Sequence, residues 1–354
     1  MIAKLGDVLL YEQPTKYIVE STDYSNEYKI PVLTAGQSFI LGYTNETENI
    51  YTDVPVIIFD DFTTSVQYVD FPFKVKSSAM KILTANNANL KYLYYLLTNI
   101  KVDTGLHKRY WISKFADMVI DLPPLDIQNE IACRLDKLED IISRKQQQLS
   151  KLDELVKSRF IELFGDPMTN PKGFPCYTVG EVIDFQGGSQ PDKKYFEYGA
   201  TPDNIRLIQI RDYKSDKYIT YIPRAMAKRF CTADDIMIGR YGPPIFQILK
   251  GIEGSFNVAL MKATPKMGNR EFVRQFLKQD CLLEYLEGLS KRTAGQDGIQ
   301  MDKLKAYPFP YPPIELQEQF AALIEQTDKS KLAVQKSLEQ LETLKKSLMQ
   351  QYFG

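Results

Sequence analysis

A repeat of 44 residues is the feature that most restricts how this chain of 354 residues can fold. Residues 122–165 and 311–354 align without a gap at an offset of 189 positions, with 12 identities. Both copies begin with two prolines, continue with an acidic residue and a glutamine, and end in Phe-Gly. Unrelated segments of this composition would share about two or three identities, so the repeat indicates an internal duplication.

Each copy of the repeat is predicted to form one long helix. Prolines stand before it, a glycine follows it, and neither residue type interrupts it. Apolar residues recur about every 3.5 positions, which indicates a coiled coil rather than a helix lying on a globular core. The predicted seam consists of Leu135, Leu138, Ile142, Leu149, Leu152 and Val156 in the first copy and Ile324, Val334, Leu338, Leu341 and Leu348 in the second.

The polar positions of the seam differ between the two copies. Lys145 of the first copy corresponds to Val334, and Lys331 of the second copy corresponds to Ile142. Each charged side chain can therefore lie along an apolar partner and turn its amino group toward water. We expect the two helices to pair within one chain; the alternative is that each helix pairs with a second subunit.

The segments between the helices are predicted to be α+β globules. In both, short apolar strands precede a helix, expected at Asn89–Asn99 in the first globule and near residues 271–287 in the second. The predicted order is a globule over 1–121, a helix over 122–165, a globule over 166–310 and a helix over 311–354.

The net charge of −1 is distributed unevenly along the chain. Residues 166–310 carry 21 basic and 17 acidic side chains, a net charge of +4, whereas the other three segments are slightly negative. The composition therefore argues against a uniformly basic nucleic-acid coat protein but allows a local basic patch.

Clusters of cations with aromatic residues and amides are candidate DNA contacts, because Arg and Lys neutralise phosphates and Arg and Gln read base edges. A surface that contacts only water is the alternative for such clusters. The candidates are Lys108, Arg109, Tyr110 and Trp111 in the first globule and Arg211, Tyr213, Lys214, Arg240, Tyr241, Lys291, Arg292 and Gln296 in the second.

Several other classes of protein are disfavoured. The chain has one histidine, His107, and four dispersed cysteines, so a zinc site is not expected. Its N-terminus lacks the apolar stretch of a signal peptide, and no apolar run approaches the ~18–20 residues that cross a bilayer. We expect a cytoplasmic protein.

These features together resemble the specificity subunit of type I restriction–modification systems. The resemblance is carried by LPPLDIQ at 122–128, YPPIELQ at 311–317, FGDP and NPKGFP after the first predicted helix, and LKKSLMQQYFG at 344–354. It implies an antiparallel coiled coil, two target-recognition domains related by a pseudo-two-fold axis, and a non-catalytic subunit whose domains each read half of a bipartite DNA site. One departure is the segment 59–64, where the family often carries His or Arg.

The resemblance also implies partners. Two methyltransferase subunits that use S-adenosylmethionine would dock on this frame, and restriction subunits that use ATP and Mg²⁺ can join them, while this chain binds no metal or other cofactor. The implied contacts to the methyltransferase are Pro123, Pro124, Gln128, Pro312, Pro313 and Gln317.

Two alternatives to a DNA-recognition subunit remain. Asp203, Asp212 and Lys214 are similar to the carboxylates and lysine of a metal-dependent nuclease. A coiled-coil adaptor that binds only proteins is the second alternative.

Overall fold

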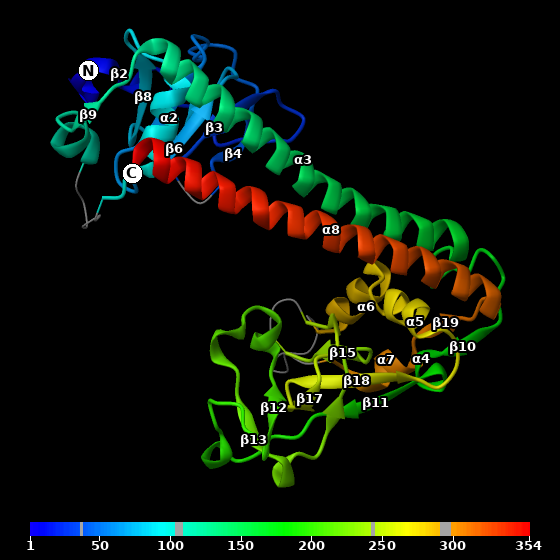
Figure 1. The fold of residues 1–354 in the computed structure, drawn as a ribbon. Helices are drawn as coiled ribbons and strands as arrows, with labels where there is room; N and C mark the ends of the chain where they lie inside the picture. The colour runs from blue at the N-terminus through cyan, green and yellow to red at the C-terminus, as the bar shows by residue number, and fades with distance from the viewer. Residues whose placement is uncertain (36–37, 103–108, 242–244, 291–298) are drawn as a thin grey trace. The chain divides into compact units, whose positions relative to one another are not determined.

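The computed structural model describes residues 1–35, 38–102, 109–241, 245–290 and 299–354 (Figure 1). The chain forms two compact units. Unit 1 consists of Met1–Gln147 and Gln335–Gly354, and unit 2 consists of Gln148–Val334. Each unit therefore contains one globule and one part of each long helix.

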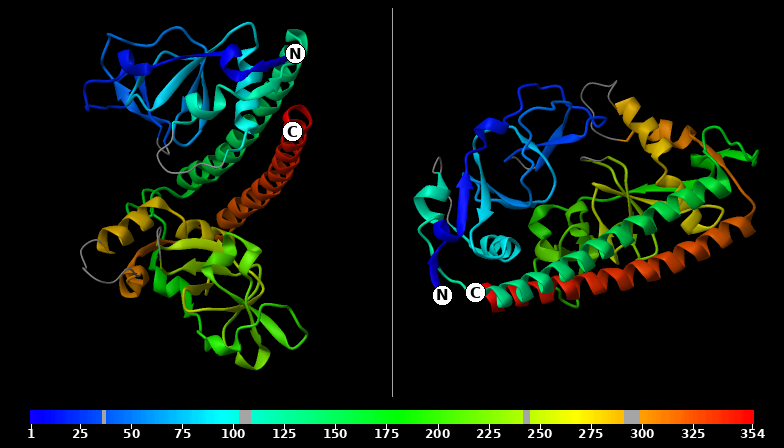
Figure 2. Two further views of the ribbon diagram at one scale, coloured as in Figure 1. Left: turned by 90° about the vertical axis from the view of Figure 1, so that its left-hand side faces the viewer. Right: turned by 90° about the horizontal axis from the view of Figure 1, so that it is seen from above.

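The two long helices are α3 (Leu125–Phe164) and α8 (Ile314–Phe353), each of 40 residues. Both begin directly after a pair of prolines, which cannot donate the backbone hydrogen bond of a helix interior. In both views of Figure 2, α3 and α8 run beside each other. The starts of the two helices are 189 positions apart, and so are their ends. This is the offset that relates the two copies of the sequence repeat.

In unit 1 the helices are antiparallel. The guanidinium of Arg134 donates to the hydroxyl of Tyr352 at 3.3 Å, and Lys345 forms an ion pair with Glu139. As the chain advances along α3, its partners on α8 therefore have falling residue numbers.

In unit 2 the same direction holds. Lys331 Nζ lies 2.5 Å from a carboxylate oxygen of Asp153, and the rings of Phe160 and Phe164 contact that of Phe320, with centroids 5.7 and 5.3 Å away. Lys331 therefore reaches a carboxylate of the opposite helix.

The predicted seam residues are all shielded from solvent at least in part. Leu135, Leu138, Ile142, Val156, Ile324 and Val334 are buried, and Leu149, Leu152, Leu338, Leu341 and Leu348 are half-buried.

The first globule is built on an antiparallel sheet, formed in this order by β2 (Leu9–Glu12), β8 (Met80–Ala85), β5 (Val56–Asp60) and β6 (Val66–Val69). A smaller sheet has the order β4 (Ile40–Thr44), β3 (Ile30–Leu33) and β7 (Lys74–Val75). The globule also contains β1 (Ile2–Lys4), which pairs with β9 (Val119–Asp121), the helices α1 (Leu5–Val8) and α2 (Leu90–Asn99), a 3-10 turn at Pro14–Tyr17 and a π-helical turn at Trp111–Phe115.

The second globule repeats this plan. Its main sheet has the order β11 (Ile183–Gly187), β18 (Leu260–Pro265), β15 (Ile236–Gly239) and β16 (Gln247–Lys250), and its smaller sheet the order β13 (Tyr221–Pro223), β12 (Asn204–Ile208), β17 (Gly254–Phe256) and β14 (Phe230–Cys231). β10 (Cys176–Thr178) pairs with β19 (Pro308–Pro310), and the helices are α4 (Val179–Val182), α5 (Arg270–Leu277), α6 (Asp280–Ser290) and α7 (Met301–Ala306).

Successive side chains of the central strand of each main sheet point to opposite faces, and each face packs against a different core. In β5, Ile57 and Phe59 join the core with α2, while Val56 and Ile58 face the core shared with the smaller sheet. In β15, Ile236 and Ile238 likewise join the core with α5, and Met237 joins that of the smaller sheet. The duplication therefore extends over the globules, although their sequences match only loosely.

One sequence prediction needs correction. The helix expected near residues 271–287 is two helices, α5 and α6, separated at Lys278 and Gln279. The side chain of Gln279 donates to the carbonyl of Gln275 at 2.9 Å. The break allows Phe276 of α5 and Leu282 of α6 to be buried in the same core.

A buried glutamine joins each globule to the helix that follows it. Gln128 Nε2 donates to the carbonyl of Pro123 at 2.8 Å, and its Oε1 accepts from the backbone N–H of Asn89, the N-cap of α2, at 2.9 Å. Gln317 repeats both bonds in unit 2, to Pro312 at 2.8 Å and from Asn269, the N-cap of α5, at 2.8 Å.

Within the described parts of the chain, no helix is both long and apolar enough to cross a membrane.

We expect Gln317→Leu to lower the free energy of unfolding by about 2 to 4 kcal/mol, because it leaves the Asn269 N–H and the Pro312 carbonyl without their partners. Denaturant-induced unfolding measures the loss. The control is Gln319→Leu at an exposed position of the same turn. Equal stability of the two variants would contradict a role for the buried side chain.

Candidate nucleic-acid interface

Three segments of the second globule meet at one end of its main sheet. The Ser189 N–H after β11 donates to the carbonyl of Phe256 at 3.1 Å, and the Arg240 N–H after β15 donates to that of Ala259 at 2.9 Å. We name residues 187–190, 240–241 and 257–259 the sheet-end surface.

Glycine makes this close approach possible. A Cβ on Gly188 would lie 1.9 Å from the carbonyl oxygen of Asn257, so no other residue fits there without moving the backbone. A Cβ on Gly187 would lie 3.9 Å from Arg240 Nη1, so this residue lies beside the guanidinium. The first segment is thus fixed against residues 257–259 and passes beside Arg240.

Arg240 and Tyr241, two predicted DNA contacts, lie on the sheet-end surface. The Arg240 guanidinium carbon is 5.3 Å from the centre of the Tyr241 ring, and Nη1 donates to the carbonyl of Val258 at 3.5 Å. Arg240 is half-buried, whereas Tyr241, Val258 and Gln190 are exposed. Sequence reasoning missed Gln190 and Val258; the Gly187–Gly188 pair was the available signal of a close backbone approach.

Arg211 and Lys214 are exposed on a neighbouring turn. The backbone N–H of Asn257 donates to the carbonyl of Ile208 at 3.0 Å, which connects this turn to the sheet-end surface. Arg211 Nη2 donates to the hydroxyl of Thr220 at 3.0 Å. Both cations are placed where a ligand can reach them.

Tyr213, the aromatic candidate of this turn, packs partly buried against the small core that contains Met237 and Phe256. Its hydroxyl oxygen is buried without a hydrogen-bond partner among the described residues, and burial raises the pKa of the phenol well above its usual range. Tyr213 therefore supports the turn rather than offering a free ring to DNA.

Asp212, a candidate metal ligand of the nuclease alternative, makes its contacts inside the fold. The side chain of Asp212 is buried and lies 3.6 Å from Arg206 Nε, and it accepts from the backbone N–H of Gln209 at 3.2 Å. Burial raises the pKa of Asp212, although the Gln209 N–H and the guanidinium of Arg206 oppose this shift. Asp203 and Lys214 are exposed. Across the described residues, no group of three or more His, Cys, Asp or Glu side chains is arranged to hold a metal ion.

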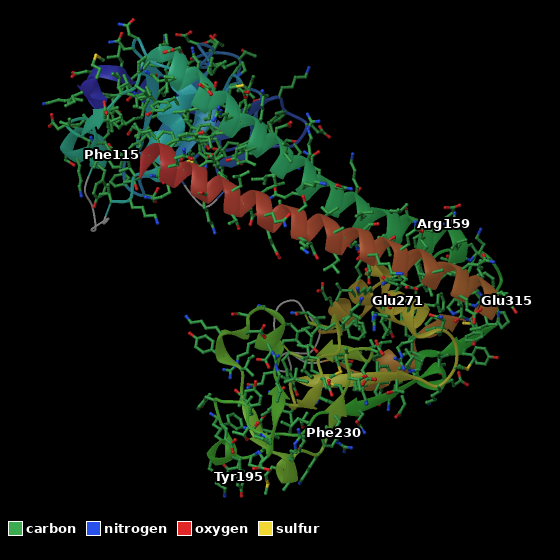
Figure 3. All side chains as sticks on the ribbon, viewed as in Figure 1. Phe115, Arg159, Tyr195, Phe230, Glu271 and Glu315 are labelled. Atoms are coloured by element: carbon green, nitrogen blue, oxygen red, sulfur yellow. The ribbon has the colours of Figure 1, made fainter. Side chains whose placement is uncertain are left out.

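The aromatic candidates of the first globule need correction. Tyr110 and Trp111 are not DNA contacts, because both are buried in the core, where the Trp111 ring packs against Phe59 and Phe115. Phe115, at the end of the π-helical turn, is labelled in Figure 3. The π-helical turn at Trp111–Phe115 places the Trp111 ring against Phe59 of β5. Arg109 remains exposed beside them.

The predicted contacts Lys108, Lys291, Arg292 and Gln296 lie outside the described residues, as does His107.

The corresponding sheet end of the first globule has a different chemistry. Asp60 ends β5, where Gly239 ends β15. Asp61 is buried in an ion pair with Lys81 at 3.3 Å and accepts from the backbone N–H of Trp111 at 2.8 Å. A hollow of about 290 Å³ opens beside these residues, lined by Thr34, Ala35, Phe39, Ile58, Asp60, Thr63, Ser65, Gln67 and Met80. Carboxylate, hydroxyl and amide groups thus stand where the second globule has Arg240 and Tyr241.

The predicted partner contacts also need correction. Gln128 and Gln317 are 2% and 0% exposed, and both ends of each side chain are bonded within the chain, so neither can contact a partner subunit. Pro312 is buried and Pro123 half-buried. Pro124 and Pro313 are exposed and remain candidates.

Exposed apolar residues of the long helices were missed from the sequence. Leu155 and Leu344 occupy equivalent positions of the two repeats and are 45% and 49% exposed. Leu125 and Ile314 at the helix starts are a second equivalent pair, also exposed. The sequence pattern that could have indicated them is an apolar residue outside the predicted seam at equivalent positions of both copies of the repeat.

Two sequence similarities connect this chain to known proteins. The family model described as the type I restriction modification DNA specificity domain matches residues 1–154 and again residues 171–343. The type I restriction enzyme EcoR124I/EcoR124II specificity subunit of Escherichia coli is 32% identical over 362 residues, which covers 92% of this chain and 85% of that subunit.

The fold has counterparts among solved structures. The S subunit of the type I restriction–modification system of M. genitalium superposes with a TM-score of 0.63 at 15% identity, covering 100% of this chain and 96% of the other. A chain from a study of complex assembly and conformational transition of the type I R-M system gives a TM-score of 0.55 at 16% identity, covering 100% and 97%. With the family model matching twice over nearly the whole sequence, the chain belongs to the family of type I restriction–modification DNA specificity subunits.

Proposed function

We propose that this chain is the non-catalytic, DNA sequence-recognition subunit of a type I restriction–modification complex. One observation carries the proposal: two globules with the same order of strands present different side chains at the same sheet end. Arg240 and Tyr241 occupy it in the second globule, and Asp60 and Thr63 in the first. A shared scaffold with exchanged edge residues is what the reading of two different base sequences requires.

Each globule reads one half of a bipartite DNA site in this proposal. The first globule carries 11 basic and 13 acidic residues over positions 1–120, so phosphate attraction contributes little to its binding. Phosphate contacts supply most of the non-specific affinity of DNA-binding proteins. We therefore expect this subunit alone to bind DNA weakly and the complex with its partners to bind it tightly.

Two methyltransferase subunits are the proposed partners, one on each copy of the repeat. Leu155 and Leu344 support this, since a duplicated chain offers the same apolar contact twice. S-adenosylmethionine would be bound by these partners, and ATP and Mg²⁺ by restriction subunits where they join. We place the complex in the cytoplasm, where it meets DNA.

Exchange of residues 166–310 for the corresponding segment of another family member is expected to change one half of the methylated DNA motif and leave the other half unchanged. The reason is that each main sheet and its sheet end belong to one globule. Sequencing of modified bases in cells that carry the subunit and its methyltransferase measures the motif. The matched control exchanges residues 1–121, and a change of both halves by either exchange would refute independent reading.

Leu155→Asp or Leu344→Asp is each expected to reduce the bound methyltransferase from two subunits to one, and the double variant to none, because a carboxylate in an apolar contact loses its hydration. Native mass spectrometry counts the subunits. Leu332→Asp is the control, since Leu332 is exposed but the equivalent residue of the first repeat is Ser143. Two bound methyltransferases in the double variant would contradict the proposed contact.

A further inference from the structure

We propose that Arg240 reads a guanine in the half-site bound by the second globule, by donating two N–H groups to O6 and N7 in the major groove. The inference rests on the proposed function and specifies its chemistry. Guanine is the only base that presents two adjacent acceptors there, and the planar guanidinium matches their spacing.

The guanidinium of Arg240 is held before DNA arrives. The Tyr241 ring lies beside it at 5.3 Å, and the carbonyl of Val258 accepts from Nη1 at 3.5 Å. The backbone N–H of Arg240 is bonded to Ala259, which fixes the start of the side chain. Because fewer rotamers are lost on binding, a side chain held in this way gains affinity and selects one base geometry.

The charge of Arg240 is not neutralised by a neighbouring carboxylate. Among the residues that the structure describes, none of the Asp or Glu oxygens lies within 4.0 Å of its nitrogens. In contrast, Arg206 lies 3.6 Å from Asp212 and 3.0 Å from Asp216. The N–H groups of Arg240 can therefore donate to an external acceptor, whereas those of Arg206 interact with carboxylates within the fold.

The surroundings of Arg240 favour a base edge over a phosphate. Its exposed neighbours on the sheet-end surface are Tyr241, Val258 and Gln190, none of which carries charge. An apolar side chain suits the methyl group of thymine, and a glutamine suits the edge of adenine. A phosphate site would instead gather further cations or backbone N–H groups.

The test uses the complex of this chain with its methyltransferase and a duplex that contains the motif found by sequencing of modified bases. Each guanine of the motif is replaced in turn by 7-deazaguanine, which lacks the N7 acceptor. We expect one replacement, in the half assigned to residues 166–310, to weaken binding by about 5-fold or more.

Arg240→Ala is expected to weaken binding to the unmodified motif by about 5- to 150-fold and to remove the effect of that 7-deazaguanine. Arg270→Ala is the matched control, because Arg270 is also an exposed arginine of unit 2 but follows the opposite end of β18. It should leave the 7-deazaguanine effect intact.

The inference would be overturned by a half-site of the second globule that contains no guanine, by binding that no 7-deazaguanine weakens, or by a 7-deazaguanine effect that persists in Arg240→Ala. Equal weakening by Arg240→Ala on all DNA sequences, with a smaller salt dependence, would assign Arg240 to a phosphate and also refute the inference. Failure of the unaltered complex to prefer any sequence would instead refute the proposed function itself, and the inference with it.

Discussion

Each globule is attached to the helix that follows it through a glutamine that is entirely enclosed. Gln128 and Gln317 connect the proline carbonyl before the helix with the N-cap of the neighbouring short helix. A backbone N–H and a carbonyl that would otherwise be buried without partners are satisfied in this way, which fixes the direction in which the long helix leaves the globule. The position of every sheet-end residue relative to its helix depends on this attachment.

Each globule also rests on the end of the other long helix. In unit 1, Asn99 Nδ2 donates to the carbonyl of Phe353 at 3.1 Å, and the rings of Tyr92 and Phe353 lie 5.2 Å apart. In unit 2, Phe272 stacks against Phe160 at 5.9 Å. Because each compact unit needs helix ends from both repeats, neither repeat completes its core without the other. A duplicated module of globule and helix thus becomes a single chain with two similar units.

Much of the architecture could be predicted from the repeat. Its spacing was sufficient for both long helices and for the apolar stripe along each of them, because a 3.5-residue apolar period allows few other structures. A similar order of strands and helix in both globules was expected, but the order of the strands within each sheet was not predictable, since strand pairing depends on packing that local sequence does not reveal. The break between α5 and α6 was missed for a related reason: neither proline nor glycine marks it, and buried contacts of Phe276 and Leu282 determine it.

Residue types alone did not separate contact residues from core residues. Arg240 and Tyr241 lie on the surface, but Tyr110 and Trp111, with a similar pattern of cation and aromatic, are buried. Likewise, Gln128 and Gln317 marked the right place in the chain but serve the interior. In contrast, Gln190 and Val258 lie near each other on one surface only because Gly188 allows two loops that are distant in the sequence to approach closely.

The sequence by itself determined the duplication and the two long helices, because the flanking prolines and glycines and the period of the apolar residues are local patterns. Pairing of the helices within one chain was one of two alternatives, and it is seen in contacts such as Lys345–Glu139 and Lys331–Asp153. Only the tertiary structure decided which polar and aromatic side chains face outward. That outcome depends on which strands become neighbours in each sheet and on how closely their loops approach. Exposure is a property of contacts between residues far apart in the sequence, and no local pattern specifies it.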